Sequence, residues 1–240
     1  MKIACVIPAR LKSTRFPRKI LAPLKGKPLI EWVWEAANAT GLFDTVVFAI
    51  DAEETADVIA SFGGKYVMTP EACLSGTERL VYLNNKKEIT ADIWVNWQGD
   101  EPFISKKMIQ DLLQTCASQD SDIWTLKERI ENPEDAESTH VVKVICNKDN
   151  YALYFSRSLI PYYREPCSHK KYFRHVGLYA YTSEALSRMI TLAPCYLEEA
   201  EQLEQLSFLY NNMRIKVHET QEKTLGIDLP EHLALAHSWA

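Results

Sequence analysis

The stretch Ile3-Ala4-Cys5-Val6-Ile7-Pro8 decides the fold. Its six residues are all apolar, as expected of a β-strand that is buried on both faces of a sheet. A helical pattern follows at residues 28–40, where Pro28 suits a first helical turn and apolar residues recur at helical spacing. The opening of the chain therefore predicts a strand–helix unit of an α/β fold.

Strand-like and helix-like segments then alternate along the first half of the chain. Strands are predicted at residues 45–50, 66–68, 93–97 and 122–126, and helices at residues 52–62, 77–84 and 106–116. This order predicts a Rossmann-like, mostly parallel central sheet with helices on both faces. Ligands of such sheets bind at the carboxyl ends of the strands, so we look for functional residues there.

After about residue 138 the pattern becomes β-rich. Strands are predicted at residues 141–146, 151–155 and 173–181, followed by a helix at 198–211, a strand at 215–219 and a final helix at 230–239. No linker, repeat or low-complexity segment divides the sequence. We therefore predict a single domain over residues 1–240, with a β-rich lobe around residues 141–195.

Composition disfavours several classes of protein. The chain has 27 basic and 32 acidic residues, and a net charge of −5 is unlike that of a general nucleic-acid binder. No apolar run is long enough for a transmembrane helix, and the apolar start is too short for a signal peptide, so we expect a cytoplasmic protein. The six cysteines form no C-x-x-C pair, which favours free thiols over disulfides or zinc. The glycines form neither a G-x-G fingerprint nor a P-loop.

Residues 10–27 form a basic loop directly after the first predicted strand. Seven of the 27 basic residues lie in it, with no acidic residue among them: Arg10, Lys12, Arg15, Arg18, Lys19, Lys25 and Lys27. Charge alone would fit a solvated surface loop, but the position at a strand end favours phosphate binding. Arginine grips phosphate oxygens with two N–H groups, and lysine adds a compact charge. The expected partner is a polyanion such as a nucleoside triphosphate.

Two aspartates are candidate metal ligands. Asp100 follows the strand at residues 93–97 within Gln98-Gly99-Asp100-Glu101-Pro102, where a metal would meet phosphates. Mg²⁺ needs only one or two protein carboxylates beside substrate oxygens. Taken alone, Asp100 is as typical of a polar turn as of a metal ligand. The basic loop at the end of the first strand favours the metal-binding interpretation. For Asp228, which precedes the last helix, a helix N-cap is the simpler interpretation. Gln98 offers a donor and an acceptor to a sugar or a base, and Glu101 is a weaker candidate helper.

Together these segments resemble the 3-deoxy-manno-octulosonate (Kdo) cytidylyltransferases, also called CMP-Kdo synthetases. The matching segments keep the family's order and span nearly the whole chain: residues 7–10, 13–17, 26–30, 75–79, 96–102, 154–157, 174–181, 203–206 and 226–228. The opening I-P-A-R is shared with the CMP-sialate enzymes. The combination of Q-G-D-E-P, F-S-R and R-H-x-G-x-Y is specific for the Kdo branch.

The resemblance implies a reaction and a fold. CTP and Kdo would give CMP-Kdo and pyrophosphate with Mg²⁺, for lipopolysaccharide synthesis, on a fold of the nucleotide-diphospho-sugar transferase type. The partners would be the two substrates and a second copy of the chain, which would dimerise through the β-rich lobe, without nucleic acid or membrane insertion.

The resemblance also implies roles for individual residues. The triphosphate would be held by Arg10, Arg15 and Lys19, and the last two would neutralise the leaving pyrophosphate. Magnesium would be bound by Asp100, the central catalytic residue, and Asp228. The cytidine would lie against Ser75, Gly76 and Gln98, the last of which could also meet the sugar. The sugar-acid pocket would be lined by Arg157, which pairs with the carboxylate, and by His175, Tyr181, Glu204 and Gln205.

The sequence departs from the family's pattern at several positions. The family commonly has glycine at the position of Arg18, histidine at that of Cys73 and arginine at that of Ser207. It commonly has threonine and aspartate at the positions of Leu229 and His232, respectively. None of them is assigned to the metal or the triphosphate. Two alternatives stay open: CTP-dependent activation of another, sialate-like sugar acid, and a nucleotide-binding module without catalysis.

Overall fold

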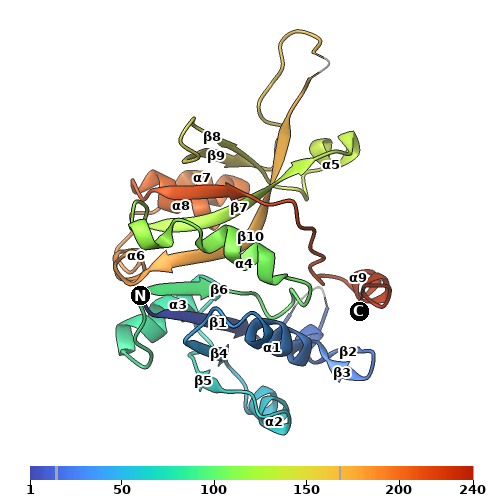
Figure 1. The fold of residues 1–240 in the computed structure, drawn as a ribbon, viewed down its shortest axis with the longest axis vertical. Coiled ribbons are helices and arrows are strands. Elements are labelled where there is room, and N and C mark those ends of the chain that lie inside the picture. The colour runs from blue at the N-terminus through green and yellow to red at the C-terminus, as the bar shows by residue number, and fades with distance from the viewer. Residues whose placement is uncertain (14–15, 168, 240) are drawn as a thin grey trace. The chain divides into compact units, whose positions relative to one another are not determined.

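The computed structural model describes residues 1–13, 16–167 and 169–239 (Figure 1). The chain divides into two compact units. The first unit comprises Met1–Gln110 and Lys223–Ala240, and the second unit comprises Asp111–Glu222. The prediction of a single domain over residues 1–240 stays a prediction, and each unit is described by itself.

The first unit contains a parallel sheet of the predicted kind. Its strands are β1 (Ile3–Ala9), β4 (Thr45–Ile50), β5 (Tyr66–Met68) and β6 (Ile93–Asn96), in the order β6-β1-β4-β5. All three pairings are parallel. Residues 4–9 of β1 are buried, because this strand lies between two neighbours and is covered on both faces.

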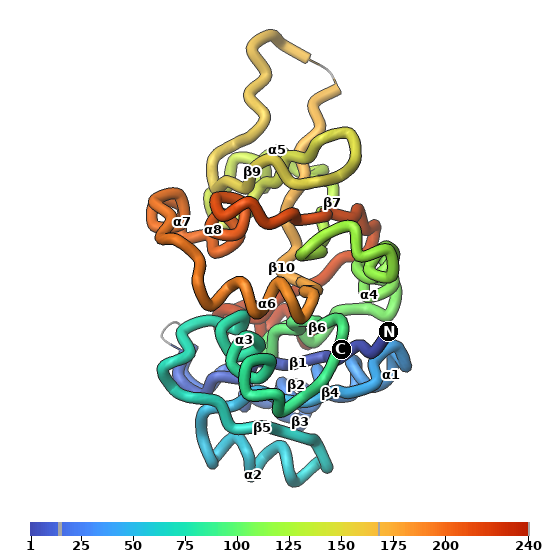
Figure 2. The backbone as a smooth tube through the Cα atoms, turned by 90° about the vertical axis from the view of Figure 1, so that its left-hand side faces the viewer, coloured from blue at the N-terminus to red at the C-terminus, as the bar shows by residue number. Residues whose placement is uncertain are grey.

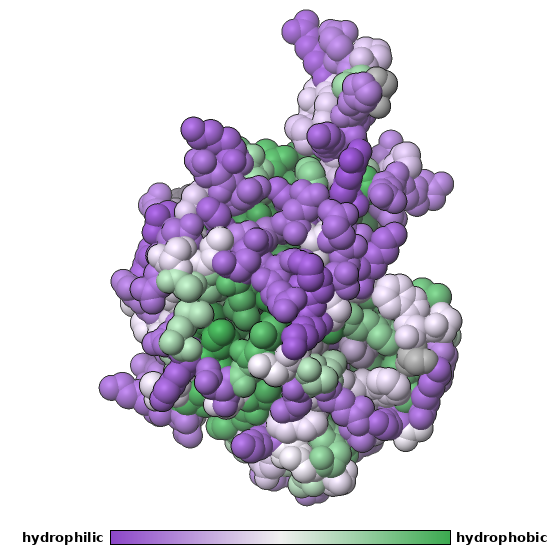
Figure 3. Space-filling model, viewed as in Figure 1, coloured by the Kyte–Doolittle hydropathy of each residue, from purple (hydrophilic) through white to green (hydrophobic). Residues whose placement is uncertain are grey.

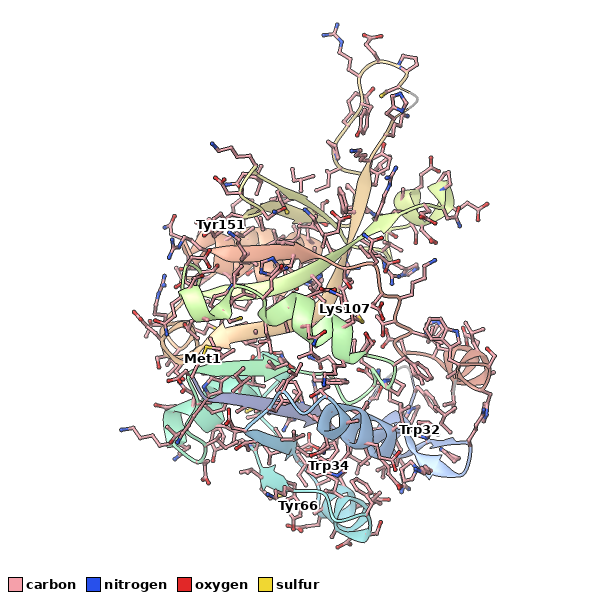
Figure 4. All side chains as sticks on the ribbon, in the orientation of Figure 1. Met1, Trp32, Trp34, Tyr66, Lys107 and Tyr151 are labelled. Atoms are coloured by element: carbon pink, nitrogen blue, oxygen red, sulfur yellow. The ribbon has the colours of Figure 1, made fainter. Side chains whose placement is uncertain are left out.

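Helices cover this sheet on two sides. Figure 2 shows α1 (Leu29–Ala39) and α3 (Gly76–Lys86) on opposite faces, as the sequence predicts, and α2 (Glu53–Ser61) connects β4 to β5. The predicted apolar face of α1 is buried at Leu29, Ile30, Val33 and Ala37. Two tryptophans of α1 fix it further (Figure 4): Trp34 stacks on Phe48 of β4, with ring centroids 5.5 Å apart, and Trp32 donates from Nε1 to the Leu24 carbonyl at 2.9 Å.

The last segment of the chain belongs to the first unit. Helix α9 (Pro230–Ala236) packs beside a small hairpin of β2 (Pro23–Leu24) and β3 (Lys27–Pro28). Their shared cluster contains Leu24, Leu29, Ile227 and Ala236, all without exposed surface. Burial of Ile227 therefore fixes the position of its neighbour Asp228.

The second unit is rich in β-structure. Strand β10 (Tyr172–Thr182) pairs antiparallel with β7 (Ile123–Ile130) and with β8 (Lys143–Cys146), β8 pairs antiparallel with β9 (Ala152–Ser156), and β11 (Ile215–Glu219) runs parallel to β7. The described residues between β9 and β10 extend away from these strands (Figure 1) and are mostly hydrophilic (Figure 3).

Some predicted helices are wrong in extent. The helix predicted at residues 198–211 is two helices, α7 (Tyr196–Glu201) and α8 (Glu204–Tyr210), because Gln202 adopts a left-handed conformation with φ 53°. The helix predicted at 106–116 ends as α4 (Lys106–Leu113), and a 3-10 turn (Cys116–Ser118) follows. Helices α5 (Pro133–Glu137) and α6 (Ser183–Met189) were not predicted.

All six cysteines are free thiols. Among the described residues, no helix combines the length and the hydropathy needed to cross a bilayer.

Candidate functional site

A cavity of about 270 Å³ opens at the carboxyl ends of β1 and β6. This is the edge at which ligands of parallel sheets bind. The strand ends, the loop after β1 and the start of α3 line it with Pro8, Arg10, Lys12, Ser13, Lys19, Ile20, Gly76, Gln98, Gly99 and Asp100. Five of the predicted nucleotide and metal residues are therefore brought together.

Lys19 is the centre of the charged part of this site. Its ammonium forms ion pairs with Asp100 and, at 3.0 Å, with Oδ1 of Asp228, and its side chain is only 12% exposed. Burial opposes the charge on Lys19, but the two carboxylates outweigh burial and raise the pKa of its ammonium above the usual value. Lys19 therefore stays protonated, and both aspartates face one positive charge.

The chain segment before α9 carries Asp228 to this place. The main-chain N–H of Ile227 donates to the Asp100 carbonyl at 2.9 Å, and the Thr224 hydroxyl donates to Oε2 of Glu101 at 2.9 Å. Leu229, not Asp228, occupies the N-cap position of α9, so the N-cap interpretation of Asp228 is wrong. Glu101 anchors the segment that bears Asp228.

Two glycines allow the cavity walls to approach closely. A Cβ on Gly99 would lie 2.9 Å from the Pro8 carbonyl oxygen, and a Cβ on Gly76 would lie 3.0 Å from Nε2 of Gln98. The side chain of Gln98 is oriented by a 2.9 Å hydrogen bond from its Nε2 to Oδ1 of Asn96. The Ser75 hydroxyl accepts from the Glu78 N–H at 3.2 Å and thereby caps α3.

The basic loop does not act as a single cluster. Arg10 and Lys12 line the cavity with Lys19, and they also contact the Leu74 carbonyl and Glu71, respectively. Arg18 instead forms an ion pair with Glu54, and Lys27 with Glu35. Arg15 lies outside the described residues, so its predicted role stays a prediction.

A buried ion pair that the sequence analysis missed fixes the start of this loop. Arg79 of α3 has no exposed surface and contacts Oδ2 of Asp51 at 2.8 Å, and Oδ1 of Asp51 accepts from the Leu11 N–H at 3.1 Å. Asp51 directly follows β4. A search of every strand end for carboxylates would have found it.

Arg157 of the second unit is held by main-chain carbonyls. Its Nε donates to the Glu201 carbonyl at 2.7 Å, and its terminal nitrogens donate to the carbonyls of Thr139 at 3.1 Å and Gln202 at 3.4 Å. The Glu201 carboxylate accepts from the Arg157 main-chain N–H at 2.9 Å and from the Ser156 hydroxyl at 2.6 Å. A guanidinium has five N–H groups, and two of those of Arg157 make no hydrogen bond to the residues that the structure describes.

His175 and Tyr181 are joined by a third ring, Tyr179, which is the tyrosine of the R-H-x-G-x-Y motif and to which the sequence analysis gave no role. Tyr179 stacks on Tyr181 with centroids 5.7 Å apart, and His175 lies 5.3 Å from Tyr179. Burial lowers the pKa of His175 to about 3, so its imidazole is neutral near pH 7.

Burial, Tyr181 and the charge of Glu204 together raise the pKa of Tyr179, so its phenol keeps its proton. Gln205 is buried beside Glu204 in the first turn of α8. The predicted sugar residues thus gather around β10 and the α7–α8 junction of the second unit: Arg157, His175, Tyr181, Glu204 and Gln205.

Comparison with known proteins gives full-length matches. Residues 4–215 match the model of a family described as cytidylyltransferase. The chain is 44% identical over 237 residues to the 3-deoxy-manno-octulosonate cytidylyltransferase of Chloroherpeton thalassium, covering 98% of this chain and 96% of that protein. It is 41% identical over 247 residues to the protein of the same name from Thermodesulfovibrio yellowstonii, covering 98% of this chain and 97% of that one.

A solved structure described as CMP:2-keto-3-deoxy-manno-octonic acid synthetase complexed with CTP is also similar. It superposes with a TM-score of 0.94 at 37% identity, covering 100% of this chain and 98% of that one.

Proposed function

Because the chain belongs to the 3-deoxy-manno-octulosonate cytidylyltransferase family, we propose that it transfers CMP from CTP to Kdo, giving CMP-Kdo and pyrophosphate for lipopolysaccharide synthesis. The observation that carries the proposal is the meeting of Lys19, Asp100 and Asp228 beside a cavity at the carboxyl ends of parallel strands. A module that only binds nucleotides would not need this pair of carboxylates.

The cavity suits a triphosphate because cationic groups line it without filling it. Arg10 and Lys19, with Arg15, bind the phosphate oxygens, and Gly76 and Gln98 lie against the cytidine beside Ser75. The anomeric hydroxyl of Kdo attacks the α-phosphorus, a new O–P bond forms, and the bond to the β-phosphate oxygen breaks in line. Catalysis of this kind depends on positioning and charge rather than on a covalent intermediate with the protein.

Asp100 and Asp228 would hold Mg²⁺. Their carboxylates already converge on one cationic group, the Lys19 ammonium, and Mg²⁺ needs one or two protein carboxylates beside phosphate oxygens, so the residues fit the ion. When bound, Mg²⁺ stabilises charge on the α-phosphate and lowers the pKa of the attacking hydroxyl. Lys19, which lies beside both carboxylates, would neutralise the pyrophosphate.

The sugar acid is bound by the second unit. The two remaining N–H groups of Arg157 pair with its carboxylate, and His175, Tyr181, Glu204 and Gln205 contact its body. His175 contacts the sugar rather than acting as general base, because a pKa of about 3 leaves it too weak a base near neutral pH.

The substitution Asp100→Asn tests the proposal. It removes a charge at the reacting phosphate, and a loss of about 3–5 kcal/mol of transition-state stabilisation corresponds to a roughly 10²–10⁴-fold lower kcat. CMP-Kdo formation at saturating CTP and Kdo measures the effect, with circular dichroism to verify the fold. Asp57→Asn, at an exposed position on α2, is the matched control. Activity of Asp100→Asn within a few-fold of the control would reject the metal role.

The remaining partners follow from the family. We propose that the chain acts in the cytoplasm as a homodimer, to which the β-rich lobe contributes the contact. Light scattering of the purified protein should give twice the chain mass of 27.5 kDa.

A further inference from the structure

Thr125 lies in β7 with no exposed surface, and its hydroxyl oxygen contacts three groups. The main-chain carbonyl oxygens of Val176 and Leu178 lie 3.1 and 2.9 Å away, and Nε2 of His175 lies 3.0 Å away. The two carbonyls flank Gly177, where β10 is irregular: Val176 pairs with Leu126, and the next paired residue, Tyr179, is opposite Thr125. The irregularity therefore directs two carbonyls at one hydroxyl.

The hydrogen atoms around Thr125 can be placed by counting donors and acceptors. Carbonyl oxygens only accept, and a hydroxyl has one hydrogen and two lone pairs. The hydrogen therefore points to a carbonyl, and the 2.9 Å separation from Leu178 lies within the usual O–H···O range. The lone pairs of Oγ1 are left for His175, so Nε2 must carry a hydrogen. If the Thr125 hydroxyl donated to Nε2 instead, its oxygen would face both carbonyl oxygens with no hydrogen in either contact.

A neutral imidazole has one N–H and one bare nitrogen. Burial keeps His175 neutral near pH 7, with a pKa of about 3. With the hydrogen on Nε2, the bare nitrogen is Nδ1. None of the residues that the structure describes donates to Nδ1, and the ring is held between Phe155, with centroids 5.0 Å apart at 83°, and Tyr179.

We propose that Thr125 is a positioning residue that fixes His175 in the tautomer protonated at Nε2, so that Nδ1 accepts a hydrogen bond from a hydroxyl group of the sugar acid. The identification of the donor as a hydroxyl of the sugar acid rests on the proposed function. The assignment of the His175 tautomer does not. A bare nitrogen attracts a hydroxyl and repels a carboxylate. His175 therefore recognises the polyol part of the substrate, which leaves the carboxylate to Arg157.

His218 provides an internal contrast. Its Nε2 lies 3.0 Å from the Thr115 hydroxyl oxygen, which already accepts from Nε1 of Trp124 at 3.1 Å. Within the described part of the chain, no carbonyl competes for the Thr115 hydrogen, so that hydrogen points to Nε2 of His218. Burial lowers the pKa of His218 to about 4, so this ring is also neutral near pH 7. The same counting of donors and acceptors therefore gives His218 the opposite tautomer, protonated at Nδ1.

The tautomers can be measured directly. In protein labelled with ¹⁵N-histidine, protonated and bare ring nitrogens differ widely in chemical shift, and the spectrum of His175→Gln assigns the His175 signals. At pH 7.5, without substrate, we expect a protonated Nε2 and a bare Nδ1 for His175, and the reverse for His218. A protonated Nδ1 on His175, or a mixture of both tautomers, would overturn the proposal.

Two variants test the positioning role. Thr125→Val keeps the shape of the side chain but lacks the hydroxyl, so we expect a mixture of His175 tautomers. The KM for Kdo should rise about 3–10-fold, which is the effect of one weakened neutral hydrogen bond. Thr125→Ser keeps the hydroxyl and should restore the tautomer and bring the KM for Kdo back to within about twofold of wild type. The KM for CTP should stay unchanged in both.

An equal rise of both KM values in Thr125→Val, or no rise in either, would reject the positioning role even if the wild-type spectrum is as expected. Failure of the wild type to turn over Kdo would reject the proposed function and leave the tautomer result standing, because the spectrum is recorded without substrate.

Discussion

At the scale of the residue, the ammonium of Lys19 organises the charged side of the cavity in the first unit. It holds two carboxylates that are 128 positions apart in the sequence, Asp100 and Asp228, at one point beside the cavity. Two aspartates this close would repel one another without a cation between them. The Lys19 ammonium therefore keeps both carboxylates together in the first unit, and under the proposed function this arrangement would reduce the reorganisation needed to bind a metal ion.

Gly99 is the residue that sets the position of Asp100. The substitution Gly99→Ala would place a Cβ 2.9 Å from the Pro8 carbonyl oxygen, a contact that real Cβ atoms essentially never show, so the main chain must move. We expect the free energy of unfolding to fall by about 1–3 kcal/mol, as for other overpacked sites, and kcat to fall more than tenfold because Asp100 moves with its neighbour. Urea unfolding and steady-state kinetics measure the two effects.

Gly177→Ala is the matched control for stability. Apart from its own chain neighbours, a Cβ at Gly177 would meet no atom of the described residues within 4 Å, so the free energy of unfolding should change by less than about 0.5 kcal/mol. If Gly99→Ala were as stable and as active as wild type, close approach to Pro8 would not constrain the site.

Sequence reasoning located some residues of the site and not others, for a physical reason. Asp100 and the basic loop directly follow predicted strands, and strand ends of a parallel sheet share one edge. Asp228 has no such local signal: it is brought to Lys19 by burial of Ile227, a contact between distant parts of the chain. Asp51 had the strand-end signal, whereas Arg79 lies inside α3, and only their pairing in space shows what they do.

At the scale of the element, the break between α7 and α8 has a tertiary cause. In one continuous helix, the carbonyls of Glu201 and Gln202 would accept from N–H groups four residues later. Here both accept from the Arg157 guanidinium instead. Nothing in the local sequence marks this break, so the periodicity of residues 198–211 predicted one helix.

Substitutions at Gln202 test whether the backbone conformation matters at this break. Because φ is 53°, Gln202→Val should lower the free energy of unfolding by about 1–2 kcal/mol, the penalty of a left-handed conformation for a β-branched residue. Gln202→Gly relieves this strain and adds freedom to the unfolded chain, so its net change should stay within about 1 kcal/mol.

Both variants lose the 2.8 Å hydrogen bond from Nε2 of Gln202 to the Glu199 carbonyl, so their difference isolates the backbone effect. Urea unfolding monitored by circular dichroism gives both values. Equal stability of the two variants would show that the left-handed turn carries no strain.

The strands were predictable because their signals are local. The bounds of β4 and β5 agree with prediction to the residue, since each is a short apolar run that ends at a polar or turn residue. The helices α5 and α6 have five and seven residues, too short to show helical periodicity. Sequence thus predicts the parallel sheet well, and the short connecting helices poorly.

At the scale of the whole molecule, two buried histidines make stability depend on pH. Burial lowers the pKa of His175 to about 3. Burial and Lys216 lower the pKa of His218 to about 4, against the opposing effect of Asp120 and Asp111. The ordinary value in an unfolded chain is about 6.5. Below that pH the unfolded chain takes up two protons that the folded chain does not, so unfolding is favoured as pH falls.

Between pH 6 and pH 5, above the range in which most carboxylates titrate, each histidine should reduce the free energy of unfolding by about 1.2 kcal/mol. Urea unfolding at several pH values in this window measures the slope, and His175→Gln and His218→Gln should each remove about half of it. A wild-type stability that is flat across this window would mean that these two imidazoles take up protons in the folded protein as readily as in the unfolded chain.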